Sequence, residues 1–112
     1  LEEELARVLP VLREAVRLGV PVSIDTYKTE VMRAALDAGA DIVNDIYALR
    51  SPGAEAVVAG HPRCGVCLMH MQGEPKSMQA APHYDDVVTE VRDFLQARAA
   101  ALRERGVAGE RI

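Results

Sequence analysis

The sequence lacks the features that mark nucleic-acid-binding, membrane or secreted proteins. Its formal net charge is −4 and its pI is near 5.3, with Lys and Arg scattered among acidic residues, so we expect no nucleic-acid partner. No apolar run approaches the roughly 18 residues of a membrane span. Residues 1–4 (LEEE) are acidic where a signal peptide would be basic. We therefore expect no membrane partner and a cytoplasmic location.

Cysteine is also scarce, and its spacing raises one alternative. Cys64 and Cys67 are interpreted as reduced thiols, because nothing indicates secretion. With His61 and His70 they form a pattern at intervals of three that resembles zinc-ligand spacing. Cys67 and His70 would point to opposite faces of a strand, however, and Arg63 would place a cation beside the metal. A Cys-x-x-Cys redox motif normally opens a helix, whereas this one leads into a predicted strand. We assign no metal ligand and no catalytic residue to the chain.

The 112 residues are 49% hydrophobic and 27% charged, as in an ordinary globular domain. Three short apolar runs end in polar side chains, with helical patterns between them: residues 20–26 (VPVSIDT), 41–46 (DIVNDI) and 66–70 (VCLMH). This spacing predicts parallel strands in two successive βαβ units. All three strands would end at one edge of a sheet, where such sheets bind ligands. That edge would carry Asp25, Asn44, Asp45 and His70.

The helical patterns predict four helices. The first runs from Leu1 to a stop at Gly19, and Pro10 should kink it or divide it in two. The second follows residues 26–29, whose hydroxyls can cap it, and has a buried stripe. The third covers residues 54–59, and the fourth is opened by Asp85 and Asp86 and stops at Gly106.

Two further segments have no clear period. Residues 71–84 contain Gly73, Pro75 and Pro82, and we predict a long loop at the ligand end of the sheet. Residues 107–112 resemble the approach to a fourth strand. Long loops at the ligand end of a sheet often carry function.

The strand ends suggest recognition of a flat polar ring. The Asp25 carboxylate can accept two hydrogen bonds from an amidine-like edge, although a helix cap or a surface charge is the alternative. Asn44 can donate and accept, which suits a ring with an adjacent nitrogen and carbonyl. Because side chains alternate along a strand, Asp45 should face away from Asn44 and support backbone groups. Met69 suits the face of a heteroaromatic ring or core packing, and His70 is interpreted as a structural imidazole.

Three segments together resemble dihydropteroate synthase: residues 23–26 (SIDT), 41–46 (DIVNDI) and 67–79 (CLMHMQGEPKSMQ), of which the last is the most specific. The similarity runs along the whole chain. It implies an α/β fold, a partial TIM (β/α)8 barrel with about three parallel strands alternating with helices. Residues 1–112 would be the incomplete central segment of that pterin-binding domain.

The resemblance implies a reaction of folate biosynthesis, in which the amine of p-aminobenzoate displaces pyrophosphate from a dihydropterin pyrophosphate, with Mg²⁺ on the leaving group. Asp25 and Asn44 match polar pterin-binding positions, and Ile46 and Met69 match apolar positions of the pterin pocket. The family's pyrophosphate and Mg²⁺ contacts are missing from the sequence, so we expect the fragment to be inactive alone.

Two other functions remain as alternatives. One is the pterin-binding segment of a folate-dependent methyltransferase, against which the sequence of residues 69–73 (MHMQG) argues. The other is a non-enzymatic assembly module. Because three strands leave unpaired sheet edges, we also expect a homodimer or another association that covers them.

Overall fold

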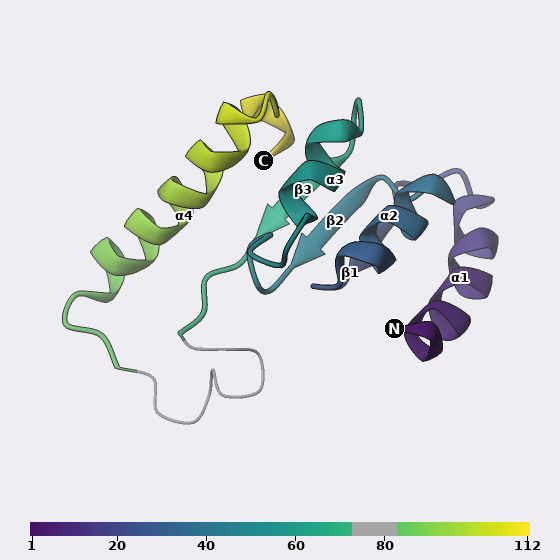
Figure 1. Cartoon of the computed structure of the whole chain (residues 1–112), viewed down its shortest axis with the longest axis horizontal. Helices are drawn as coiled ribbons and strands as arrows, with labels where there is room; N and C mark the ends of the chain where they lie inside the picture. The colour runs from purple at the N-terminus through teal and green to yellow at the C-terminus, as the bar shows by residue number, and fades with distance from the viewer. Residues whose placement is uncertain (73–82) are drawn as a thin grey trace.

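The computed structural model describes residues 1–72 and 83–112, and it consists of a parallel sheet whose strands alternate with helices (Figure 1). This arrangement confirms the predicted alternation. Residues 73–82, which include most of the predicted loop and part of the most specific resemblance, lie outside the described residues. The elements in chain order are α1 (Glu2–Val16), β1 (Ser23–Asp25), α2 (Thr29–Asp37), β2 (Ile42–Asp45), α3 (Ala54–Gly60), β3 (Gly65–Leu68), α4 (Val87–Glu104) and a short 3₁₀-helix, η1 (Gly109–Arg111).

The three strands pair in parallel in the order β1-β2-β3. The first is shorter than predicted and begins at Ser23. Pro21 has no N–H to donate to a ladder, and the Val22 N–H donates instead to the Asp41 carboxylate at 2.8 Å. The last strand ends at Leu68, so the polar tip predicted for it lies beyond the strand.

The core lies on one face of the sheet. Ile24, Val43 and Val66 occupy the same register position on the three strands and are 8%, 0% and 5% exposed. Helices α1, α2, α3 and α4 supply the other side of this core. The predicted stripe of α2 is buried as expected: Val31, Met32, Ala35 and Leu36. In Figure 1, α4 lies at the β3 side of the sheet and α1 at the opposite side.

For Pro10 we predicted either a kink or a division into two helices, and one helix spans that residue. Pro10 is exposed, and so is Ala6, whose carbonyl would have received the missing hydrogen bond. Water can therefore bind that carbonyl at little cost. The predicted division into two short helices is wrong.

The sequence predicted side-chain caps at the starts of α2 and α4, and the structure shows such a cap only at α4. Asp86 caps α4 by accepting a hydrogen bond from the Thr89 N–H, as predicted. Helix α2 has no side-chain cap, because the nearby hydroxyls have other partners. Thr26 Oγ1 accepts from the Lys28 N–H at 3.1 Å, and Thr29 Oγ1 donates to the Pro52 carbonyl at 2.8 Å. The Thr26 hydroxyl therefore hydrogen-bonds within its own loop, and the Thr29 hydroxyl connects the start of α2 to the loop before α3.

Residues 107–112 contain the short helix η1 in the position where the sequence suggested the approach to a strand. Arg111 within it donates to the carbonyls of Val58, His61 and Cys64. Its guanidinium thus binds carbonyls at the carboxyl end of α3, where a cation is favoured. Within the part of the chain that the structure describes, no helix combines the length and apolarity needed to cross a membrane.

Candidate ligand-binding face

The face of the sheet opposite the core carries a row of side chains at the carboxyl ends of the strands. Asp25 pairs in register with Asn44, and Asn44 with Cys67. Asp25 and Cys67 are exposed and Asn44 is half-buried. Because side chains alternate, this row faces away from Ile24, Val43 and Val66. The two polar residues predicted to bind a ligand are therefore direct neighbours.

Two apolar candidates follow this row. The Met69 N–H donates to the Asp45 carbonyl at 3.3 Å, which continues the pairing of β2 with β3 beyond its last strand residues. In that register Met69 is the next partner of Ile46. Both side chains are half-buried. The structure thus brings Asp25, Asn44, Ile46 and Met69 to one edge, with polar groups on β1 and β2 and apolar groups beyond β2 and β3.

Asp45 occupies the opposite face and is fully buried. Its two carboxylate oxygens accept hydrogen bonds from the backbone N–H groups of Tyr47 and Leu49, both at 2.8 Å. Burial raises the pKa of Asp45 because it disfavours the charged form, while the two backbone hydrogen bonds act in the opposite direction. The prediction that Asp45 supports backbone groups is confirmed.

His70 lies among aromatic groups. Its Nδ1 is 3.4 Å from the Tyr84 hydroxyl, and its ring meets that of Phe94 edge to face with centroids 5.1 Å apart. The Arg50 guanidinium lies over the Tyr47 ring at 4.2 Å and over the Phe94 ring at 5.1 Å. These contacts agree with the structural role predicted for the imidazole. The sequence offered no partner for it, because Tyr84 and Phe94 are distant along the chain.

The zinc-like spacing does not assemble a site. His61 Nδ1 accepts from the backbone N–H groups of Arg63 and Cys64, and the Cys64 thiol is buried near the Val58 carbonyl. Cys67 is exposed on the sheet. Among residues 1–72 and 83–112, no group of three or more His, Cys, Asp or Glu side chains can hold a metal ion. The described residues therefore assemble no such cluster for the Mg²⁺ that the resemblance implies.

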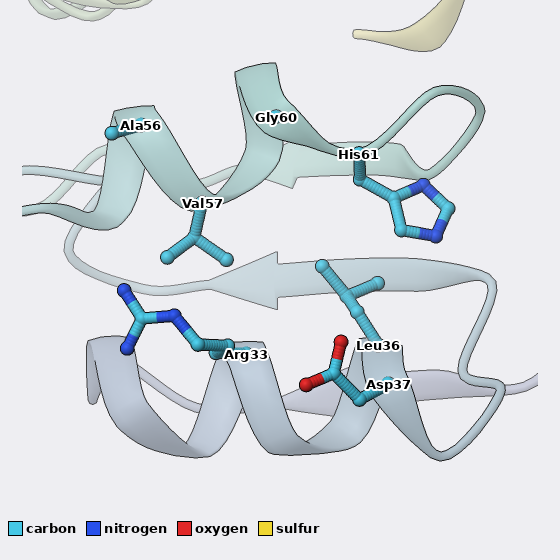
Figure 2. A pocket seen from close by; sticks show the side chains of 7 residues that line it. All are labelled: Arg33, Leu36, Asp37, Ala56, Val57, Gly60 and His61. Carbon is cyan, nitrogen blue, oxygen red and sulfur yellow. The ribbon is translucent and has the colours of Figure 1, made fainter.

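A groove of about 300 Å³ lies between α2 and α3 (Figure 2). Figure 2 shows Arg33 and Asp37 of α2 reaching toward α3, and Val57 of α3 reaching toward α2. The groove is on the helix side of the sheet, and its lining residues include none of the four candidates: Arg33, Leu36, Asp37, Ala56, Val57, Gly60 and His61. It is therefore separate from the candidate face.

Sequence reasoning missed two residues, one on α4 and one on α3, that hold the turn after β2. Arg98 of α4 donates to the carbonyls of Ala48 and Leu49, and Glu55 of α3 binds Arg98 at 2.7 Å. The helical pattern of α4 gave Arg98 no special position. Only the tertiary structure brings it to a loop about fifty residues earlier in the chain.

Comparison with known proteins gives consistent matches. The family model described as "Pterin binding enzyme" matches residues 1–112. The dihydropteroate synthase of Neisseria meningitidis serogroup C is 52% identical over 112 residues, covering 99% of this chain and 40% of that protein. The Escherichia coli K12 enzyme is 48% identical over 115 residues, covering 100% of this chain and 40% of that protein.

Solved structures agree. The Burkholderia cenocepacia dihydropteroate synthase complexed with 7,8-dihydropteroate is 60% identical with a TM-score of 0.91, and the match covers 100% of this chain and 40% of that one. The Stenotrophomonas maltophilia enzyme is 56% identical with a TM-score of 0.91, covering 96% of this chain and 41% of that one. The chain thus spans about 40% of the length of the curated relatives reported above.

Proposed function

The chain belongs to the pterin binding enzyme family, and on this premise we propose that its protein is a dihydropteroate synthase to which these residues contribute the pterin-binding face. In that reaction a C–N bond forms between the amine of p-aminobenzoate and the methylene carbon of dihydropterin pyrophosphate. The C–O bond to pyrophosphate breaks, and the amine loses a proton. The relatives reported above carry the name of this synthase, which favours it over a folate-dependent methyltransferase.

The pairing of Asp25 with Asn44 is the observation that supports this function most strongly. A pterin presents an edge of N–H groups next to a carbonyl and ring nitrogens. A carboxylate can accept two hydrogen bonds from that edge, and a neighbouring amide can both donate and accept. Ile46 and Met69, half-buried beyond the strand ends, would contact the flat face of the ring. Met69 suits this role because its thioether is polarizable.

The charge of Asp25 suggests a contribution to the reaction itself. As pyrophosphate leaves, positive charge develops on the methylene carbon and the pterin ring. A fixed carboxylate at the ring edge stabilises that charge more in the transition state than in the ground state. Mg²⁺, implied by the family resemblance, would neutralise charge on the leaving pyrophosphate. The part assigned to this chain is pterin binding, and we expect no dihydropteroate formation by the chain alone.

The assembly and location of the protein are part of the same proposal. Residues 1–112 would form the central segment of a TIM barrel. In the 112-residue chain alone, the outer edges of β1 and β3 pair with no further strand among residues 1–72 and 83–112, which favours a homodimer or another association that covers them. A cytoplasmic location is consistent with the free thiols of Cys64 and Cys67.

Titration calorimetry with a hydroxymethyl dihydropterin tests the face directly. We expect the Asn44→Ala variant of the 112-residue chain to bind roughly tenfold or more weakly than the wild type, because it loses hydrogen bonds to the pterin edge. Ser23→Ala is the matched control, since Ser23 is an exposed polar residue of β1 that lies two register rows before the pair of Asp25 and Asn44. It should leave the affinity unchanged. Equal heats from the wild type and Asn44→Ala would contradict the assignment.

A further inference from the structure

The turn that follows β2 has an unusual backbone. Ala48 and Leu49 have φ values of 53° and 59°, in the left-handed region that L-residues with side chains rarely adopt. Both residues are fully or almost fully buried. Two consecutive left-handed residues are unfavourable, and such a conformation persists only where the surrounding structure holds it in place. Neither residue is a glycine, so other groups must stabilise the turn.

Those groups act on the turn from two sides. Asp45 accepts from the N–H groups of Tyr47 and Leu49. From α4, Arg98 donates through Nε to the Ala48 carbonyl at 2.8 Å and through Nη2 to the Leu49 carbonyl at 3.2 Å. The turn is therefore held at its donors by a carboxylate and at its acceptors by a guanidinium.

Glu55 in turn holds Arg98. One Glu55 oxygen binds Arg98 Nη2 at 2.7 Å, and the other binds Arg105 Nε at 2.6 Å. The Arg98 and Glu55 side chains are only 17% and 21% exposed. The hydrogen bond from Arg98 is the largest cause of the lowered pKa of Glu55. A planar guanidinium can bind two carbonyls and a carboxylate at once, which the single ammonium of lysine cannot reproduce in this geometry.

We propose that Arg98 is a positioning residue for the candidate face that would bind the pterin. Together with Asp45, Arg98 fixes the turn that begins at Ile46, and so fixes the orientation of the Asn44 and Ile46 side chains. This inference rests on the function proposed above. The chain passes directly from Asn44 through Asp45 into the turn, and Asn44 itself is tied to β1 by the hydrogen bond from Thr26 N–H to its carbonyl. Rotation of the turn would move Ile46 away from its neighbour Met69.

Amide hydrogen exchange on the 112-residue chain gives the first test. In Arg98→Met the Leu49 and Tyr47 amides should exchange roughly tenfold to a hundredfold faster, because the turn loses two charge-assisted hydrogen bonds. The Val43 amide in the centre of the sheet should be unchanged. Glu55 keeps Arg105 as a partner in this variant, so no unpaired charge is created. Arg92→Met is the matched control, since Arg92 lies on the same helix, is exposed and, among the described residues, pairs only with Asp93.

A rescue experiment separates positioning from general stability. Ala48→Gly relieves the left-handed backbone without touching Arg98. In the double variant Arg98→Met/Ala48→Gly, exchange at Leu49 should slow toward the wild-type rate. Unchanged exchange in Arg98→Met, or acceleration of equal size at Val43 and Leu49, would overturn the proposal.

Pterin affinity gives the second test. Arg98→Met should weaken binding of a hydroxymethyl dihydropterin by roughly tenfold. Arg98→Lys should bind the pterin almost as weakly, and the double variant Arg98→Met/Ala48→Gly should recover part of the lost affinity. Affinity unchanged in Arg98→Met would overturn the positioning role. Absence of binding by the wild-type chain would refute only the proposed function. The exchange rates of Leu49 and Tyr47 would still decide whether Arg98 holds the turn.

Discussion

Asp45→Ala should destabilise the chain strongly, although Asp45 is not expected to touch a ligand. The substitution removes the acceptor of two backbone N–H groups, each 2.8 Å from a carboxylate oxygen. The Leu49 bond is buried, so its donor would be left without a partner or would require rearrangement of the left-handed turn.

The size of the effect follows from these contacts. A buried N–H that loses its acceptor costs about 1–3 kcal/mol, and two such groups give an upper range of about 2–6 kcal/mol. Removal of a buried charge acts in the opposite direction, because its desolvation no longer opposes folding. We therefore expect a net loss of about 2–4 kcal/mol from the free energy of unfolding. Asp45→Asn should lose less, because its amide oxygen can still accept one hydrogen bond.

The pH dependence has a definite sign. Burial raises the pKa of Asp45 in the folded chain, so the folded state holds this proton more tightly than the unfolded state does. The contribution of Asp45 is then greatest below its ordinary pKa of about 4 and declines as pH rises through the raised folded pKa. The stability difference between the wild type and Asp45→Ala should narrow over that interval.

Urea unfolding followed by circular dichroism, repeated across this pH range, measures these quantities. An unchanged m-value would show that the variant still unfolds as one unit. A free-energy loss below about 0.5 kcal/mol, typical of a surface substitution, would refute the supporting role of Asp45. A difference that widens as pH rises would refute the raised pKa.

Two further predictions concern other parts of the fold. Glu55→Gln should cost about 1–2 kcal/mol near neutral pH, because it weakens charged hydrogen bonds to Arg98. Since the pKa of Glu55 is lowered in the folded chain, this loss should decline as the pH falls below the ordinary Glu pKa and through the lowered folded pKa, which unfolding at neutral and acid pH will show. Gly39→Ala should cost about 1–3 kcal/mol, because Gly39 has a φ of 110° and an added Cβ would lie 3.0 Å from Val16 Cγ1. Gly60→Ala, whose Cβ would meet nothing within 4 Å, is its control in thermal unfolding, and equal melting temperatures would contradict the steric reasoning.

The strands and their polar ends could be predicted from the sequence because their signals are local. Alternation separates Val43 from Asn44, and both faces of β2 appear in the structure as the pattern indicates. The stripe of α2 is likewise encoded within a few turns of one helix. These features can be predicted without knowing which elements pack against them.

The errors arose where tertiary contacts compete with local signals. Nothing near Thr26 indicates that its hydroxyl would hydrogen-bond to Glu4 and not cap α2. The strand β1 is short because Asp41 binds the N–H of Val22, although Pro21 was a local warning. Arg98 was the hardest to predict, because an arginine on an amphipathic helix usually faces solvent and its acceptors belong to a distant loop.

Binding of a pterin to the open face of the sheet is tested most directly by a two-dimensional NMR titration of the isotope-labelled chain with a hydroxymethyl dihydropterin. The predicted result is that the amide signals of Asp25, Asn44, Ile46 and Met69 shift together and fit the same dissociation constant. Shifts confined to the groove between α2 and α3 would contradict it, as would a spectrum unchanged by the ligand.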